Sequence, residues 1–184
     1  MNYLLHIIRK DFSLSGEIKP TPEHRMFQLL CLTITFTTFI LLIPANYLQN
    51  LPLMVNTPLA ILGCGSLILY QAALSGNHFN MTLLAMLLAT INATWFFNGG
   101  NDGSVPYFFF PICMYPLIIF SGKKRWTTLA AIIVNACVLI WLPYRYPWLA
   151  TTYKSPFDRP VGLMIVCVIS ALACVMVLWV ILNS

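Results

Sequence analysis

The sequence predicts an all-α membrane protein, a bundle of six transmembrane helices. Hydrophobic residues make up 59% of the chain and charged residues only 8%, whereas about a quarter of the residues in a soluble domain are charged. The apolar residues also fall into six runs, each close to the roughly 20 residues that a helix needs to cross the hydrocarbon core. These runs are Met26–Tyr47, Thr57–Ser75, Met81–Phe97, Pro106–Phe120, Thr127–Pro143 and Val161–Leu182.

The segment before the first run is expected to be a cytoplasmic tether. Leu4, Ile8 and Phe12 recur at helical spacing, with charged residues between them. This pattern is typical of a short amphipathic helix that lies on the membrane surface. The sequence therefore predicts two parts, a tether over residues 1–25 and a six-span domain over residues 26–184.

Spans two and four contain residues that are expected to shape the packing of the bundle. Residues 63–66 read Gly-Cys-Gly-Ser, and such small side chains allow another helix to approach closely. In the fourth run, Pro106 is suited to begin a helix, whereas Pro111 and Pro116 should bend it because proline removes a backbone hydrogen bond.

The connection between spans three and four, Asn98–Val105, is rich in glycine and amide side chains. The flanking runs have 17 and 15 residues, hence about 26 and 23 Å of helix, and both fall short of roughly 30 Å of hydrocarbon. We therefore expect this turn to lie below the outer membrane surface. Irregular backbone at that depth must be buried in protein or line a water-filled cavity. An ordinary glycine-rich turn is the alternative.

The last connection, Tyr144–Pro160, is the longest and carries five aromatic residues. Aromatic side chains at this depth usually form an interfacial belt. A lid over an outward-facing cavity is the alternative interpretation.

Basic residues predict the orientation of the chain. With a cytoplasmic N-terminus, seven Lys and Arg residues lie inside and three lie outside. The net charge of +5 then matches the anionic inner leaflet, and no basic face remains for nucleic acid. We expect both termini to be cytoplasmic and the protein to lie in the inner membrane of a bacterium, in contact with membrane lipids.

None of the six runs contains an Asp, Glu, Lys or Arg. Ion-coupled transporters normally keep an ionisable group inside the membrane, and enzymes need a set of catalytic groups, so neither class is favoured. The six cysteines lie inside the spans without the spacing of metal ligands. Three histidines at the cytoplasmic edge do not suit haem. We expect no metal, no cofactor and no catalytic residue.

Uncharged polar and aromatic residues remain as candidates for a binding site, because small-molecule pockets combine apolar walls with a few polar groups. For Asn92 and Asn135, a hydrogen bond between helices is the alternative role. For the aromatic residues, the alternative is lipid contact or core packing. The candidate ligand-binding residues are Asn92, Trp95, Asn98, Asp102, Tyr115, Asn135 and Trp141.

Three sequence features resemble one known group of domains. They are Pro-Glu-His-Arg at Pro22–Arg25, the Asn-Gly-Gly-x-x-Gly turn at Asn98–Gly103 with the aromatic and proline residues of Pro106–Pro111 after it, and the basic turn Gly122–Arg125. The chain resembles the N-terminal six-span sensory input domains of bacterial membrane-bound signalling proteins, which precede histidine kinase, diguanylate cyclase or nucleotide cyclase modules. The resemblance implies a homodimer and an output module after Ser184.

We therefore expect a membrane sensory domain of a bacterial signal-transduction protein, of the two-component type or a related one. It would bind a small apolar or lipid-like signal and pass a helix displacement to a cytoplasmic output module. The alternatives are a small transporter or channel-like protein without ion coupling, and an assembly subunit of a membrane complex.

Overall fold

The computed structural model describes residues 22–49, 51–77, 79–151 and 158–182. Most of the tether expected over residues 1–25 therefore lies outside the described residues. The described part is helical and contains no strand. The longer helices are α2 (Pro22–Phe36), α3 (Ile43–Leu48), α4 (Leu53–Leu74), α5 (Asn80–Trp95), α6 (Phe109–Ile119), α7 (Gly122–Arg145) and α8 (Asp158–Leu182).

Short helical segments complete the chain. A π-helix, η1 (Thr37–Leu42), joins α2 to α3 without a break. Three 3₁₀ segments lie between α5 and α6, and a fourth follows α7. They are η2 (Phe96–Asn98), η3 (Gly100–Asp102), η4 (Val105–Phe108) and η5 (Pro147–Leu149). Each of the six apolar runs thus corresponds to one continuous helical segment.

Four of these segments are long and apolar enough to cross a membrane. They are His24–Leu48, Leu53–Leu74, Asn80–Asn98 and Gly122–Arg145. Two further apolar segments, Val105–Ile119 and Arg159–Val175, are shorter over the residues searched. The fold is therefore an all-α arrangement of the kind expected for a membrane protein, with four candidate spans.

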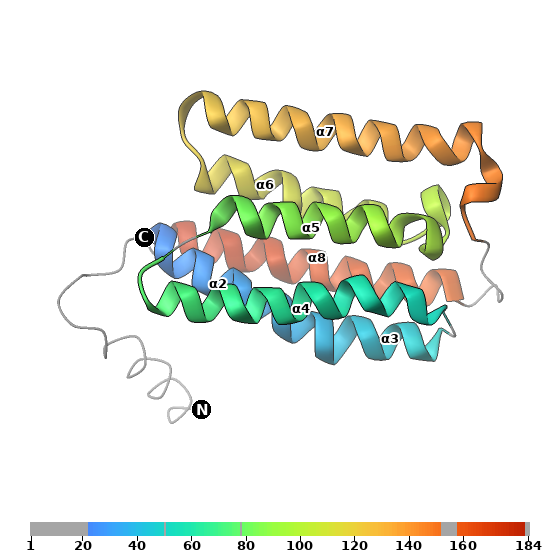
Figure 1. The fold of residues 1–184 in the computed structure, drawn as a ribbon, viewed down its shortest axis with the longest axis horizontal. Coiled ribbons are helices and arrows are strands. Elements are labelled where there is room, and N and C mark those ends of the chain that lie inside the picture. Colours follow the sequence, from blue (N-terminus) through green and yellow to red (C-terminus); the bar gives the residue numbers. More distant parts are fainter. Residues whose placement is uncertain (1–21, 50, 78, 152–157, 183–184) are drawn as a thin grey trace.

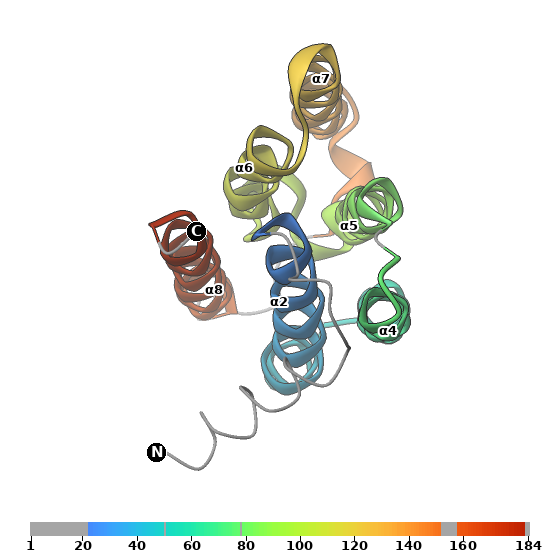
Figure 2. The same ribbon diagram turned by 90° about the vertical axis from the view of Figure 1, so that its left-hand side faces the viewer.

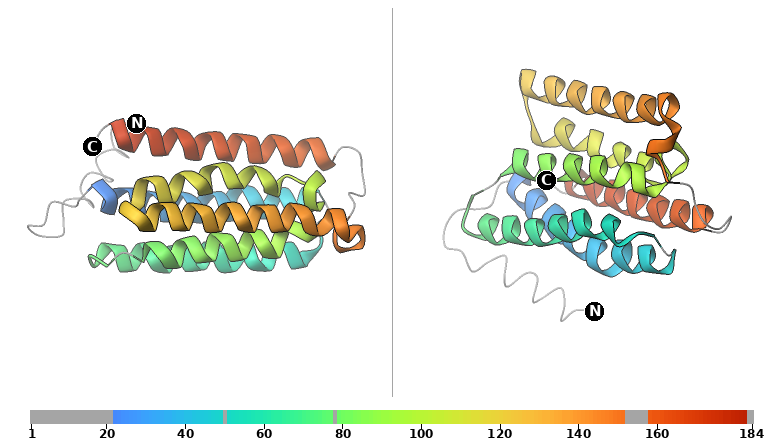
Figure 3. Two further views of the ribbon diagram at one scale, coloured as in Figure 1. Left: turned by 90° about the horizontal axis from the view of Figure 1, so that it is seen from above. Right: turned by 45° about the vertical axis from the view of Figure 1, so that its right-hand side comes forward.

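The helices run alternately up and down along one axis (Figure 1), so α2 begins at the same end of the bundle at which α8 finishes. We call this end the lysine end, because α7 begins there with Lys123 and Lys124. The opposite end, which carries Asn98–Ser104, is called the turn end. Figure 3 shows from two other directions that the helices are aligned along this axis.

Helix α2 lies near the centre of the bundle in the end-on view of Figure 2, with α4 and α5 on one side and α6 and α8 on the other. Helix α7 packs outside α5 and α6 at one edge. This position explains why α7 presents many apolar side chains outward, including Trp126, Val134 and Trp141.

The small residues of α4 contact three neighbouring segments, with Gly63 facing Phe39 of η1, Gly65 facing Met86 of α5, and Ser66 facing Thr35 of α2. A Cβ atom added to Gly63 would lie 2.6 Å from the Phe39 ring, and one added to Gly65 would collide with the end of Met86. The hydroxyl groups of Thr35 on α2 and Ser66 on α4 lie 2.8 Å apart. Small side chains in this stretch of α4 therefore allow both close packing and an interhelical hydrogen bond.

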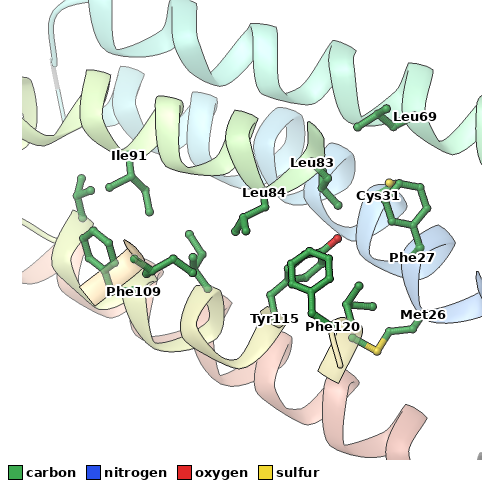
Figure 4. Close-up of a cluster of buried hydrophobic side chains, with 14 of the residues drawn as sticks. Met26, Phe27, Cys31, Leu69, Leu83, Leu84, Ile91, Phe109, Tyr115 and Phe120 are labelled. Atoms are coloured by element: carbon green, nitrogen blue, oxygen red, sulfur yellow. The ribbon is translucent and has the colours of Figure 1, made fainter. Parts of the chain in front are cut away.

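The apolar core lies between α2, α4, α5 and α6 (Figure 4). Phe27, Leu83 and Trp95 are fully buried in it, and Trp95 meets Phe109 edge to face, with ring centroids 6.0 Å apart. Pro106 lies in the first turn of η4, in agreement with its predicted helix-starting role. Pro116 lies inside α6 and is buried.

Candidate ligand-binding site

A cavity of about 470 Å³ lies inside the bundle. This volume falls in the range of about 300–1,000 Å³ found for small-molecule pockets. The wall formed by α2 and η1 contributes Leu30, Leu32, Thr33, Ile34, Phe36, Thr37, Thr38, Leu41 and Leu42. The other walls contribute Leu59, Leu62, Leu87, Thr90, Ile91, Thr94, Phe108, Pro111, Ile112, Tyr115, Ile169, Ser170, Leu172 and Ala173.

The cavity wall is uncharged. The described residues that line it are apolar, aromatic or hydroxyl-bearing, with neither an acid nor a base among them. A charged ligand held there would lose its hydration without gaining an ionic partner, which is costly. The cavity therefore suits a neutral, largely apolar molecule.

Most hydroxyl groups in the wall already have acceptors. Thr37 donates to the carbonyl of Thr33 at 2.7 Å, and Thr94 donates to the carbonyl of Thr90 at 2.8 Å. Two hydroxyl groups differ, since the Oγ1 atom of Thr38 and the Oγ atom of Ser170 are buried without a hydrogen-bond partner in the described part of the chain. A buried polar atom without a partner is uncommon and needs an explanation.

Thr38 lies in the π-helix η1. It is only 1% exposed, and its carbonyl accepts the N–H of Ile43, five residues later. Single π-turns inserted in α-helices frequently occur at functional sites. Thr37 lies in the same π-helix and donates to the carbonyl of Thr33, so the two neighbouring threonines differ in the hydrogen bonding of their hydroxyl groups.

The cavity opens sideways between α2 and α8. Among the described lining residues, three have exposed side chains, Leu32 and Phe36 on α2 and Leu172 on α8. Leu32 is 37% exposed, Phe36 61% and Leu172 51%. The opening thus lies on the long side of the bundle, away from both ends, and its rim is apolar.

Tyr115 separates this cavity from a second one at the lysine end. Its side chain lines the apolar cavity, and its hydroxyl donates to the backbone oxygen of Asn80 and lies equally far, 3.2 Å, from the Asn80 side-chain oxygen. Asn80, Phe120 and Lys124 belong to the wall of the second, open cavity, which is also about 470 Å³. Figure 4 shows Tyr115 beside Phe120 in the core.

Glycine is required in the Asn98–Ser104 turn for two different reasons. Gly99 and Gly100 have φ angles of 76° and 58°, in the left-handed region that favours glycine. Gly103 has an ordinary extended conformation, but an added Cβ would collide with the backbone carbonyl of Asn98. The left-handed backbone at Gly99 and Gly100 and the close backbone contact at Gly103 therefore account for the three glycines of the turn.

The turn contacts α7 before that helix ends. The Nδ2 of Asn101 donates to the carbonyl of Ile140 at 2.9 Å, five residues before α7 ends at Arg145, which corresponds to about 7.5 Å along the helix. Thr151 donates its N–H and its hydroxyl to the carbonyl of Phe96. The turn is thus held between α7 and the chain that follows it, while Asn101 and Asp102 stay exposed.

Buried amide and hydroxyl groups gather where the turn meets α3 and α8. The Nδ2 of Asn98 donates to the hydroxyl of Ser104 at 3.3 Å. Gly162 lets α8 approach this point, since its added Cβ would lie 3.2 Å from Gln49 and 3.5 Å from Ser104. Gln49 and Ser104 are 6% and 2% exposed. These contacts connect three parts of the chain, the end of α3, the turn and α8.

The structure brings one of the seven candidate residues to the cavity. Tyr115 lines it. Trp95 is fully buried in the core with its ring N–H unpaired among the described residues, and Asn98 is buried in the turn. Asn92 and Asn135 are partly buried. Asp102 and Trp141 are exposed, and Asp102 lies 3.4 Å from Arg159. These six side chains do not line the cavity.

Sequence reasoning missed Thr38 and Ser170. Span one contains a run of threonines, Thr33, Thr35, Thr37 and Thr38, which was the available signal. In a regular helix each of these hydroxyl groups can donate to a carbonyl one turn earlier, and the first three do so. Nothing in the sequence distinguishes Thr38 from its neighbours.

Comparison with protein-family models, with curated proteins and with solved structures gives no match to this chain. The resemblance to six-span sensory input domains therefore rests on the sequence features of residues 22–25, 98–111 and 122–125. The cavity and its opening are the structural observations on which a function can be built.

Proposed function

We propose that this chain is a six-helix membrane receptor domain of a bacterial signalling protein, which binds a small apolar or lipid-like signal in the cavity between α2, α4, α5, α6 and α8. The observation that carries this proposal is the uncharged cavity of about 470 Å³ that opens through the side of the bundle. Such an opening faces acyl chains when the bundle is embedded in a bilayer. The sensory role and a homodimeric state are taken from the sequence resemblance.

All six helical segments cross the inner membrane in this proposal, with both termini in the cytoplasm. The clustering of Lys123, Lys124 and Arg125 at the end where α2 begins supports this orientation, because basic residues favour the cytoplasmic side. The segment Val105–Ile119 is short for a crossing. Its turn would then lie in the outer half of the bundle, with Asn101 bonded to α7 and the exposed side chain of Asp102 in contact with water on the outer side.

Signal transmission would proceed through α8. Ile169, Ser170 and Ala173 form one wall of the cavity, so a ligand contacts α8 directly as well as α2, α4, α5 and α6. A bound ligand can shift the position of α8 only if it binds one position more tightly than another. Displacements of about 1–2 Å between packed helices are a known means of switching.

Binding can be tested with protein in lipid nanodiscs, by measuring the thermal unfolding midpoint with a panel of neutral lipid-soluble compounds that includes methyl decanoate, decanol and undecane. A cavity-filling variant, Ala173→Phe, should abolish any ligand-dependent rise of the midpoint. Ala93→Phe is the matched control, since Ala93 is exposed on α5 and does not line the cavity. Absence of a shift with all compounds would refute the proposal, as would a shift that Ala173→Phe leaves intact.

Transmission can be tested by electron-spin distance measurements between labels at Leu74 on α4 and Val175 on α8, both exposed. The exposed cysteines of the chain are first replaced by serine. A stabilising ligand should change the distance between the labels, and the change should be absent in Ala173→Phe. If the distance between the labels does not change when the protein is saturated with ligand, the chain binds the ligand but does not transmit the signal through α8.

A further inference from the structure

We infer that the second cavity, at the lysine end, holds the phosphate of an anionic phospholipid headgroup, with Lys124 as its cationic partner. This cavity of about 470 Å³ is formed by residues 79–82 at the start of α5, residues 119–120 at the end of α6, and Ser121 and Lys124 at the start of α7. Its wall is polar and charged where that of the apolar cavity is not. The inference does not depend on the proposed receptor function.

Three helix ends meet at this cavity, since α5 begins, α6 ends and α7 begins at the lysine end (Figure 1). Ile119 and Phe120 are buried and form its closed side. The Nε of Arg125 donates to the carbonyl of Phe120 at 2.7 Å, and Gly122, with a φ angle of 56°, turns the chain from α6 into α7. The cavity is therefore built on an apolar base and on a turn that a side chain holds in place.

Lys124 supplies the charge of the wall. Among the described residues that line the cavity, it is the one that is ionised at neutral pH. Its Nζ lies 4.6 Å from the centroid of the Phe120 ring, a contact that favours an ammonium group at this position. In the part of the chain that the structure describes, the ion pair between Asp102 and Arg159 lies at the turn end, and Lys124 takes part in none. An anion in the cavity thus meets a cation that no described acid neutralises.

Neutral hydrogen-bond donors surround the same space. Ser121 is the N-cap residue of α7, but its hydroxyl makes no capping hydrogen bond, and the hydroxyl-bearing Thr82 is exposed. Helix α5, which begins at Asn80, also has no side-chain cap. Uncapped N–H groups at the start of a helix attract anions, and here they add to the charge of Lys124. A phosphate has several acceptor oxygens and can use these donors together.

The position of the cavity favours a lipid over a free phosphate. Two candidate membrane spans begin in or beside its wall, at Asn80 and at Gly122, so the cavity lies at headgroup depth when these segments cross the bilayer. Phe79 and Met81 in the wall are 49% and 47% exposed, and they offer apolar surface to the acyl chains outside. Basic pockets between transmembrane helices bind the headgroups of anionic lipids.

The role of the charge is tested by comparing two neighbouring lysines. Lys123 and Lys124 are both exposed in the first turn of α7, but only Lys124 lines the cavity. Lys124→Gln should weaken the binding of phosphatidylglycerol to detergent-purified protein roughly 3- to 10-fold, as measured by native mass spectrometry, and Lys124→Arg should retain it. Lys123→Gln removes the same charge from the same helix and should leave the affinity unchanged. Equal losses in the two glutamine variants would reduce the effect to general surface charge and overturn the inference.

Two further ligands test the chemistry of the headgroup. Phosphatidylcholine carries the phosphate without a net charge, and glycerol phosphate carries it without acyl chains. Phosphatidylglycerol should bind more tightly than either. Equal binding of the two lipids would show that the site does not select an anionic headgroup. Glycerol phosphate binding as tightly as phosphatidylglycerol would show a site for a free phosphate ester and overturn the assignment to a lipid.

The cavity itself is tested by filling it without a change of charge. Thr82→Trp should weaken phosphatidylglycerol binding as Lys124→Gln does. Ala85→Trp is the control, because Ala85 is exposed one turn later on α5 and lies outside the wall. Equal affinity in these two tryptophan variants would show that the lipid binds elsewhere. Stabilisation by neutral compounds should persist in Thr82→Trp and Lys124→Gln, so the two proposals can fail separately.

Discussion

The side chains of Asn46 and Asn56 form a buried hydrogen bond that joins α3 to α4, with the Nδ2 of Asn46 donating to the Oδ1 of Asn56 at 2.8 Å. They are 7% and 8% exposed. A direct amide pair at the turn end fixes how the first two helical segments meet, next to Gln49, which is also buried. Both residues lie close to the chain reversal between Leu48 and Leu53.

Removal of one partner should destabilise the fold more than removal of both. Asn56→Leu leaves a buried amide donor of Asn46 without its acceptor, and we expect a loss of about 1–2 kcal/mol in the free energy of unfolding. Replacing both residues by leucine should recover part of this loss. A double-mutant cycle on unfolding in detergent measures the coupling, and additive losses in the two single variants would show that the bond contributes nothing.

A second prediction concerns Gly103, where there is no space for a side chain. An alanine Cβ there would overlap the backbone carbonyl of Asn98, so the backbone must move, and Gly103→Ala should lower the free energy of unfolding by about 1–3 kcal/mol. Gly76→Ala is the control, since Gly76 has a φ of 87° but no atom within 4 Å of an added Cβ. Thermal unfolding of the two variants compares a collision with conformational strain alone, and an equal or smaller loss in Gly103→Ala would contradict the geometry of the turn.

Hydropathy predicted the order and type of the helical segments well, because each apolar run is bounded by polar, glycine or proline residues. The boundaries differ where a helix contains residues that hydropathy leaves out. Helix α7 begins at Gly122 rather than Thr127, since Lys123, Lys124 and Arg125 are compatible with a helix and can extend their charged ends into water. Helix α4 begins at Leu53 and includes Pro58 in its second turn.

The cavity was less predictable than the helices, because its shape depends on gaps between side chains of five separate helices. Tyr115 was predicted as a wall residue and lines the cavity. Asn135 and Trp141 were chosen for polarity and aromaticity alone, and these properties do not show which face of α7 meets the bundle. The hydroxyl of Thr38 differs from those of Thr33, Thr35 and Thr37 only in its hydrogen bonding, and hydropathy contains no information about that difference.

Asn135 carries a third prediction. Its Nδ2 is buried without a hydrogen-bond partner in the described part of the chain, and it lies on the side of α7 that also buries Ile132 and Leu139. An unpaired amide in a membrane interior is unfavourable, so Asn135→Leu should raise the thermal unfolding midpoint. Asn92→Leu is the comparison, because Asn92 is partly buried but has no buried unpaired atom. A lower midpoint in Asn135→Leu would mean that the amide has a structural partner or a bound ligand.

A fourth prediction concerns the orientation of the whole bundle and uses Asp102 and Lys123, which lie at opposite ends of it. Asp102 lies in the turn and its side chain is 80% exposed, and Lys123 lies in the first turn of α7 at the other end. With the lysine end in the cytoplasm, a membrane-impermeant maleimide added to spheroplasts should label Asp102→Cys. It should label Lys123→Cys only in inverted vesicles.

The two cysteine variants should fold normally. Asp102→Cys removes an exposed ion pair with Arg159 at 3.4 Å, and such pairs contribute about 0–1 kcal/mol. The native cysteines lie on the helices that form the bundle, so their reaction in the parent protein sets the background. Labelling in the reverse pattern would place the lysine end outside, against the distribution of basic residues. Labelling of both positions from the same side would show that the segment Val105–Ile119, which lies between them, does not cross the membrane.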